Sequence, residues 1–295
     1  TRAGMICDGC DNNCTYCSIP QMRGRLRSRH RDEIVDEVRK LARQGVQEII
    51  LAGQDTASYG KDIGGIRLSG LLQHLSTHTD IPWIRVCYAS IDNVDDSLAD
   101  VIAEHTNICK YLDIPIQHAS PKILRLMGRC DRPEENQAKI DHLRQTVPEI
   151  ALRTSVIVGF PGETEKDFEE LVNFLKRSQF DMVGVFAFSP QPGTPASTMS
   201  NQVPDYIKQE RLIEIVAIQE EISRIRASEL LGKLTDLLVD ESHPDYFIGH
   251  TQYDAPEVDR VVRVKGSGDP GKFVKVRIET FLRHYEFEGT AIASR

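Results

Sequence analysis

Three cysteines lie close together in the stretch Gly9–Cys17, which reads GCDNNCTYC. Cys10, Cys14 and Cys17 have the spacing C-x-x-x-C-x-x-C. Thiolates are soft ligands that suit iron–sulfur clusters or zinc. Three thiolates in so short a loop can bind three irons of a cubane 4Fe-4S cluster, which leaves the fourth iron open to a substrate or cofactor. The sequence therefore predicts a metal centre in this loop, with these three cysteines as its ligands.

Cys7 offers an alternative, because a fourth thiolate could close the site as structural zinc or as an electron-transfer cluster. Zinc sites usually separate their cysteine pairs by a dozen or more residues, so that two knuckles can face one metal. Only three residues separate Cys10 from Cys14. Cys7 also ends an expected strand at residues 2–7, where a cysteine is more often a small buried hydrophobe than a ligand. We therefore favour the open, three-cysteine site.

Composition limits the class of protein. The chain has 295 residues, of which 40% are hydrophobic and 27% charged, as in an ordinary globular protein of more than one domain. No apolar run is as long as a membrane span. Four of the seven cysteines crowd into one region, so they do not form an even disulfide framework. This usage predicts a reducing compartment, the cytoplasm, and inert thiols at Cys87, Cys109 and Cys130.

Positive charge is densest at Arg23–Arg31, where five arginines fall within nine residues. One interpretation is a solvated loop, since charge runs usually are. The other is a rim beside the cysteine loop that binds carboxylates or phosphates through guanidinium forks. The net charge of the whole chain is −8, which argues against nucleic-acid binding by its whole surface and favours a basic partner.

Strands and helices alternate through the first three quarters of the chain, and the strands are near-continuous apolar runs, which predicts a parallel sheet covered by helices. Six strands are too few for a closed eight-stranded barrel, so we expect an open, partial β/α barrel. The strands are expected at residues 2–7, 46–53, 82–88, 111–117, 151–159 and 182–189, and the helices at 32–44, 68–75, 95–105, 121–127, 134–147, 165–177 and 204–231. Chemistry in such folds gathers at the carboxyl ends of strands, where the cysteine loop and Gln54, Asp55, Gln117, Gly159 and Ser189 fall.

The pattern changes near Gly232, where short alternating strands punctuated by glycine replace the helices. Five of them, at residues 234–239, 246–252, 260–264, 273–280 and 286–292, predict a small antiparallel barrel. This segment resembles a TRAM domain, a module often found on RNA-modifying enzymes. We therefore divide the chain into a core at residues 1–231 and a TRAM-like barrel at residues 232–295.

The cysteine loop closely resembles that of the radical S-adenosylmethionine (radical SAM) superfamily, and a core followed by a TRAM domain resembles its methylthiotransferase family. Five stretches carry the finer resemblance, to members that modify a ribosomal protein: RGRLRSR (23–29), GQDTASYG (53–60), IPIQHAS (114–120), MGR (127–129) and DAPEVD (254–259). That family has a second 4Fe-4S cluster in an N-terminal domain. No second closely spaced cysteine triad stands in this sequence, so we expect a fragment that lacks that domain.

The resemblance also implies roles for single residues. Cys10, Cys14 and Cys17 would hold the cluster, whose open iron chelates SAM, and Tyr16 would lie against the adenine. Gln54 and Asp55 would lie where the superfamily contacts the SAM amino group. Arg153 is a candidate for the SAM carboxylate or ribose, unless it pairs with a buried carboxylate. The stretches Val156–Gly159 and Phe186–Ser189 would flank the adenine, although Val156 and Phe186 are also ordinary core residues by type.

The activity implied is the replacement of C–H by C–S at the β-carbon of an aspartate in small-subunit ribosomal protein twelve. Such a hydrogen is not acidic, so a radical made from SAM by one electron from a donor protein must remove it. The alternatives are a tRNA adenosine methylthiotransferase and a non-catalytic RNA-binding protein with a structural metal. Residues 228–295 hold 12 acidic and 9 basic side chains, which favours a basic protein partner over RNA. Charge reversal at Glu257 and Asp259 is expected to separate these cases.

Overall fold

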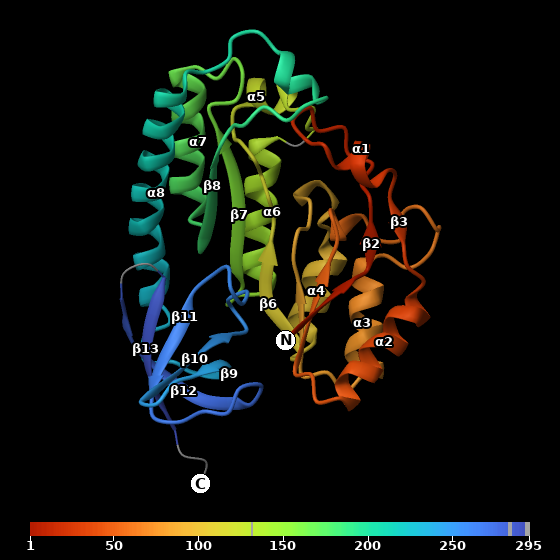
Figure 1. Ribbon diagram of the computed structural model, residues 1–295, viewed down its shortest axis with the longest axis vertical. Coiled ribbons are helices and arrows are strands. Elements are labelled where there is room, and N and C mark those ends of the chain that lie inside the picture. The colour runs from red at the N-terminus through yellow and green to blue at the C-terminus, as the bar shows by residue number, and fades with distance from the viewer. Residues whose placement is uncertain (131, 283–284, 293–295) are drawn as a thin grey trace.

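A six-stranded, all-parallel sheet forms the first part of the chain in the computed structural model, which describes residues 1–130, 132–282 and 285–292 (Figure 1). Its strands follow one another in chain order, each paired with the next, and β1 and β8 form open edges. The predicted open, partial β/α barrel is therefore confirmed. The strands are β1 (Arg2–Met5), β4 (Glu48–Ala52), β5 (Trp83–Val86), β6 (Ile108–Asp113), β7 (Ala151–Val158) and β8 (Met182–Ala187).

Helices cover one face of this sheet, because alternate strand residues such as Ile49, Leu51, Ile84 and Val86 are buried in a single core with the apolar sides of the helices. Helix α7 starts at a capping box, in which Thr164 and Asp167 satisfy each other's backbone N–H groups. The helices are α2 (Arg31–Arg43), α3 (Leu68–His78), α4 (Asp96–Glu104), α5 (Pro121–Leu126), α6 (Pro133–Thr146), α7 (Glu165–Ser178) and α8 (Asp205–Ser228). The other face of the sheet is the concave face of the partial barrel.

Strand β6 lies three residues earlier than its apolar run predicted. Its ladder with β7 stops near Pro115, which has no N–H to donate. Pairing resumes at Gln117, whose N–H donates to the carbonyl of Ser155 at 2.9 Å. Gln117 thus sits at the carboxyl edge of the sheet, as expected, although outside the regular strand.

Short elements that were not expected from the sequence flank the cysteine loop. Strands β2 (Cys7–Asp8) and β3 (Arg27–Ser28) pair as a short antiparallel ladder, and α1 (Ile19–Arg23) lies between them in sequence. The loop at residues 9–18 is therefore the tip of a small two-stranded arm at the end of the sheet away from the C-terminal domain (Figure 1).

The C-terminal domain is a closed five-stranded barrel in the order β10-β11-β13-β12-β9. Its expected strands are all present, which confirms the small barrel, and its neighbouring pairs run antiparallel except for β11 and β13, which run parallel. An odd number of strands cannot alternate in direction around a closed ring, so at least one neighbouring pair must be parallel. The strands are β9 (Leu234–Ser242), β10 (Tyr246–Thr251), β11 (Val261–Lys265), β12 (Phe273–Phe281) and β13 (Glu286–Ala291).

This barrel packs against the concave face of the sheet, near the ends where the strands begin. Trp83 and Tyr111 of the sheet are buried in one cluster with Leu238, Tyr253 and Ala255 of the barrel. Cys87 and Cys109 belong to the same cluster, and burial raises the pKa of each thiol to about 12. Both are therefore inert as expected, whereas Cys130 is exposed.

Buried ion pairs join the two domains inside this interface. Arg85 on β5 pairs with Glu48 on β4 at 2.8 Å and donates to the carbonyls of Thr251 and Gln252 in the barrel. His250 of β10 bonds the same Glu48 at 2.9 Å. A second group joins Arg153 of β7 to Asp113 of β6 and to Asp259 of the barrel, each at 3.2 Å.

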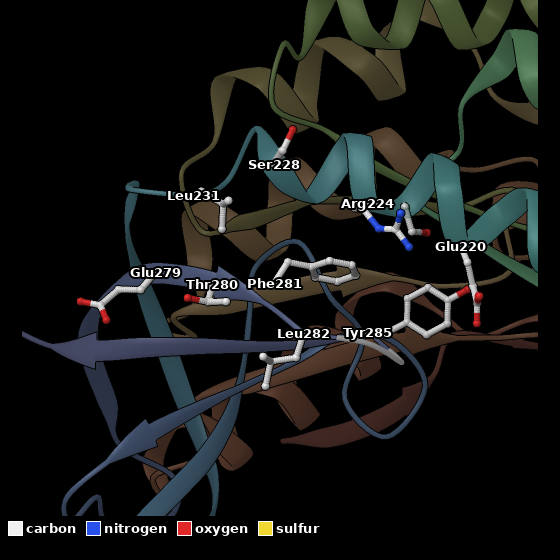
Figure 2. A pocket seen from close by; sticks show the side chains of 10 residues that line it. Glu220, Arg224, Ser228, Leu231, Glu279, Thr280, Phe281, Leu282 and Tyr285 are labelled. Atoms are coloured by element: carbon white, nitrogen blue, oxygen red, sulfur yellow. The ribbon is translucent and has the colours of Figure 1, made fainter.

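A cavity of about 490 Å³ lies between the last turns of α8 and the barrel. Figure 2 shows the rings of Phe281 and Tyr285 on the barrel side, with Arg224 and Glu220 extending from the helix. Its lining includes no residue from the carboxyl ends of the sheet strands, so it is separate from the site described below. Among the described residues, no helix is both long enough and apolar enough to cross a membrane.

Candidate metal and cofactor site

The cysteine loop presents three half-buried thiols, and backbone amides already point at two of them. The N–H of Asn12 donates to Sγ of Cys10 and the N–H of Ile19 donates to Sγ of Cys17, both at 3.4 Å. Hydrogen bonds of this kind stabilise thiolate ligands and tune iron–sulfur clusters. The donor set and its amides therefore fit a 4Fe-4S cluster held by Cys10, Cys14 and Cys17.

The arginine run holds this loop in place. Arg25 forms a forked pair with Asp11 at 2.6 and 3.1 Å, and the N–H of Leu26 donates to the same carboxylate. Arg27 pairs with Asp8 at 3.0 Å. The proposed guanidinium rim is thus largely used within the chain, where it fixes the arm around the cysteines.

The MGR stretch and an aromatic stack hold the other side of the loop. The N–H of Thr15 donates to the carbonyl of Met127 at 2.9 Å. A Cβ on Gly128 would lie 2.5 Å from the carbonyl oxygen of Asn13, so only glycine allows this approach. Tyr16 packs edge-on against Phe160, the residue after Gly159, with ring centroids 6.4 Å apart.

Cys7 lies outside this group. Its side chain is 1% exposed, its Sγ lies 3.7 Å from the carbonyl oxygen of Asp55, and burial raises the pKa of the thiol to about 12. This packing favours the interpretation of Cys7 as a small buried hydrophobe rather than a fourth ligand.

Gly53 provides a direct check on the packing of Cys7, because a Cβ at position 53 would lie 2.6 Å from Sγ of Cys7. We expect Gly53→Ala to destabilise the protein by about 1–3 kcal/mol through overpacking. The double change Cys7→Ala with Gly53→Ala should restore most of this loss, as measured by urea unfolding. Additive losses in the double variant would show that the thiol and Gly53 are not in contact.

Asp55 connects the cysteine loop to the sheet. Its buried carboxylate accepts from Nδ2 of Asn12 at 3.2 Å, from Oγ of Ser58 at 2.6 Å, from Nδ2 of Asn93 at 3.0 Å and from the N–H of Ser90 at 3.0 Å. These four donors occupy the carboxylate, so its role here is to fix the loop.

Gln54 is better suited than Asp55 to receive an amino group. Its Oε1 is buried and has no hydrogen-bond partner in the described part of the chain. A buried acceptor in this state favours a ligand that brings a donor. This orphaned oxygen, next to the cysteine loop, fits the ammonium group of SAM.

The remaining predicted contacts divide between the two faces of the sheet. Phe186 lies on β8 beside Ile157, with which it is in register, and is 55% exposed on the concave face. Val156 is fully buried in the helix-side core, which favours the packing interpretation of that residue. Arg153 reaches the concave side, but its guanidinium is paired with Asp113 and Asp259.

Gly159 follows β7 at a turn where a Cβ would lie 2.3 Å from Cγ of Lys208. It has φ +72°, and its N–H donates to the carboxylate of Glu163 at 2.8 Å, which Arg211 pairs with on the other side. Ser189 is exposed in the loop after β8. Both residues lie at the carboxyl edge of the sheet, where the resemblance implied an adenine site.

Three residues of the site were missed by sequence reasoning. Asn12 donates to Asp55 through its side chain and to Cys10 through its N–H, Ser90 donates to Asp55, and neither residue type stands out in a loop. Tyr88 has φ +59° and is 51% exposed at the end of β5. An aromatic residue that ends the apolar run PWIRVCY was the available signal for it.

Comparison with known families agrees with this fold. The model of the radical SAM superfamily matches residues 5–175, and the model of the TRAM domain matches residues 231–292. The chain belongs to the radical SAM superfamily.

The most similar relatives narrow this class further. The chain is 44% identical over 281 residues to the ribosomal protein uS12 methylthiotransferase RimO of Clostridium perfringens, a match that spans 95% of this chain and 63% of the relative. It is 42% identical over 283 residues to the RimO of Clostridioides difficile, spanning 95% of this chain and 64% of the relative. The chain thus spans less than two thirds of the length of these relatives.

Solved structures agree on the fold alone. The radical SAM methyltransferase TsrM from Kitasatospora setae superposes with a TM-score of 0.56 at 20% identity, over 66% of this chain and 38% of that one. Coproporphyrinogen III oxidase (HemN) from Escherichia coli also gives 0.56, at 15% identity, over 75% of this chain and 52% of that one.

Proposed function

We propose that this chain carries the radical-generating core of a methylthiotransferase that modifies an aspartate of ribosomal protein uS12. The observation that carries the proposal is the continuous connection from the cysteine loop through Asn12 to Asp55, beside the orphaned Oε1 of Gln54. Gln54 directly precedes Asp55, so this connection brings an unpartnered acceptor near the loop that carries the three thiols, which supports the proposal. The identity of over 40% to enzymes of that name supports the choice of reaction.

The cluster and SAM, when bound, supply a 5′-deoxyadenosyl radical able to remove hydrogen from an unactivated carbon. The chain's own residues hold the two groups and shape the space around them. Gln54 would accept from the amino group of SAM, and Tyr16 and the backbone at Gly159 would border the adenine. The barrel closes the amino-terminal end of the concave face, so the reacting groups are enclosed from that side.

A basic protein is a better candidate than tRNA for the substrate. The net charge of −8 disfavours phosphate backbones, and two arginines of the basic run are paired with Asp8 and Asp11. Exposed acids of the barrel, Glu241 and Glu257, border a cavity of about 590 Å³ next to β1. Together these features favour a lysine- and arginine-rich partner such as uS12 or the small subunit that carries it, and hence action in the cytoplasm with an electron donor protein.

The sequence suggested charge reversal at Glu257 and Asp259, but the structure shows that Asp259 has to be replaced in this test. Asp259 is not on the surface: its side chain is fully buried and pairs with Arg153, so reversing it would disturb the domain interface. Glu241 and Glu257 are exposed and serve instead. Glu279, an exposed acid on β12 beside the other cavity, is the matched control.

We expect Glu241→Lys with Glu257→Lys to weaken binding of uS12 roughly tenfold at low salt, because two opposite-charge attractions become repulsions. Glu279→Lys should leave binding within about twofold of the wild type. Titrations of the complete gene product with uS12, and with tRNA at the same ionic strengths, measure this. Tighter binding of the double variant to tRNA, together with methylthiolated tRNA from the wild type, would replace our proposal with the tRNA enzyme.

We also propose that residues 1–231 form the radical SAM core and residues 232–295 the TRAM-like barrel. The second 4Fe-4S cluster that the resemblance implied would be bound outside these residues.

A further inference from the structure

Tyr88 has a backbone conformation that tyrosine rarely adopts. It follows β5 by two residues and has φ +59°, in the left-handed region that disfavours residues with a Cβ. Strain of this kind persists only where the surroundings fix the backbone, and it gathers at functional sites. Contacts of the backbone around Tyr88 must therefore hold this conformation.

Two hydrogen bonds fix the backbone around it. The carbonyl of Tyr88 accepts from the N–H of Thr56, and the N–H of Ala89 donates to the carbonyl of Asp113, both at 2.9 Å. The conformation is thus imposed from two neighbouring strand ends.

The conformation changes the face on which the ring lies. On β5, Ile84 and Val86 point to the helix-side core, while Trp83, Arg85 and Cys87 point to the barrel side. Regular alternation would send Tyr88 toward the helices. Instead its ring is 51% exposed, and its phenol interacts electrostatically with Asp113, Arg153 and Asp259 of the concave side.

Tyr88 also lies beside the cofactor site. Its carbonyl is bonded by Thr56, the residue after Asp55, and Ser90 donates to the carboxylate of Asp55. Asp55 in turn holds Asn12 of the cysteine loop. The ring therefore stands between the cofactor edge of the sheet and the buried charges that the barrel covers.

We propose that Tyr88 is a specificity-determining residue that contacts the acceptor polypeptide in the concave face. The inference rests on the proposed function. SAM is accounted for at the cysteine loop and Gln54, so an exposed ring on the barrel side of them meets the other reactant. The carboxylates of Asp113 and Asp259 share the single guanidinium of Arg153, so this group carries a net negative charge. A negative charge near the ring suits an acceptor segment with a lysine or arginine next to the reacting residue. Burial raises the pKa of Tyr88, so the phenol is a neutral hydrogen-bond donor.

Tyr88→Gly separates a functional ring from a structural one, because glycine adopts positive φ without strain. Gln179→Gly is the control: Gln179 has φ +47° at the C-terminus of α7, is exposed, and lies away from the concave face. The measurements are the thermal unfolding midpoint of the cofactor-free protein, and the affinities of the reconstituted complete gene product for uS12 and for SAM.

We expect both glycine variants to keep or raise the unfolding midpoint. Tyr88→Gly should weaken uS12 binding about tenfold, as the loss of an aromatic contact with its hydrogen bond does, and leave SAM affinity unchanged. Tyr88→Phe, which loses only the hydroxyl, should fall between. Gln179→Gly should bind uS12 like the wild type.

A lower unfolding midpoint in Tyr88→Gly with uS12 affinity unchanged would make Tyr88 a packing residue and overturn the inference, while the proposed function stands. Weaker SAM binding by that variant would also overturn it, by assigning the ring to the cofactor. A wild-type protein that fails to bind uS12 would overturn the proposed function and this inference together, whatever the variants do.

Discussion

Alanine at Cys10, Cys14 or Cys17 is expected to abolish binding of the 4Fe-4S cluster, whereas alanine at Cys7 is expected to leave it. Each of the three thiolates would bind a different iron, so one loss would leave two ligands for a cluster whose fourth iron has to stay open for SAM. Cys7 is packed against Gly53 and Asp55 with its side chain 1% exposed, so we expect it to stay outside the cluster. The amount of cluster bound by each variant is measured after anaerobic reconstitution, from its iron and sulfide content and its absorbance in the visible range.

Cleavage of SAM gives a second measurement of the same difference. Reduced wild-type protein and Cys7→Ala should both release 5′-deoxyadenosine, and the other three variants should release none. Zinc without iron in the wild type, or loss of the cluster in Cys7→Ala alone, would show that the closed four-cysteine alternative is correct.

Periodicity and apolar runs predicted the fold because they reflect burial. Strands β4 to β8 contribute alternate residues to the helix-side core, and each long helix has an apolar side that meets it. The misplacement of β6 arose where the apolar run continued past Asp113 while Pro115 ended the ladder. The parallel pair β11 and β13 depends on the closure of the barrel, which single strands do not encode.

The site was predicted less completely than the fold, and for a physical reason. The cysteine spacing is local, so it could be read directly. The roles of Asp55, Asp259 and Tyr88 depend on partners brought together by the fold: Asn12 for Asp55, Arg153 for Asp259, and Thr56 for Tyr88. The acid at 259 looked like a surface charge because the sequence does not show that the barrel buries it against the sheet.

The largest effect on stability is expected from the ion pairs between the domains. Arg85→Leu should lower the free energy of unfolding by about 3–5 kcal/mol, because it leaves the carboxylate of Glu48 buried without its cation and two barrel carbonyls without their donor. Lys275→Ala is the control, since Lys275 and Asp236 form a half-exposed pair at 3.4 Å on the same barrel, worth at most about 1 kcal/mol.

Trp83 gives a direct signal for this interface. It is the one tryptophan in the chain, and its ring lies 5.8 Å from that of His250 and 4.8 Å from that of Phe273 in the barrel. Urea unfolding followed by its fluorescence therefore reports separation of the barrel from the sheet as well as global unfolding. In Arg85→Leu the fluorescence change should come at lower urea than in Lys275→Ala.

The same interface should make stability depend on pH in both directions. Burial alone would raise the pKa of Glu48, but the charge of Arg85 and the hydrogen bond from His250 outweigh it and lower this pKa to about 2. A lowered carboxyl pKa stabilises the folded state fully above about pH 4.5, and this contribution is lost as the pH falls toward 2. Burial alone would lower the pKa of His250, but its bonds to Asp240 and Glu48 raise it. That stability is complete below about 6.5 and is lost as the pH rises through the raised value.

The urea midpoint should therefore be highest between about pH 4.5 and 6.5 and fall on either side. His250→Gln should lose the decline on the alkaline side, because glutamine can bond both Asp240 and Glu48 but does not titrate. Arg85→Leu should lose much of the decline on the acid side, since Glu48 then titrates closer to its ordinary pKa. Equal midpoints for Arg85→Leu and Lys275→Ala at pH 6, or an unchanged alkaline decline in His250→Gln, would mean that apolar packing around Trp83 and Tyr111 holds the two domains together without the buried charges.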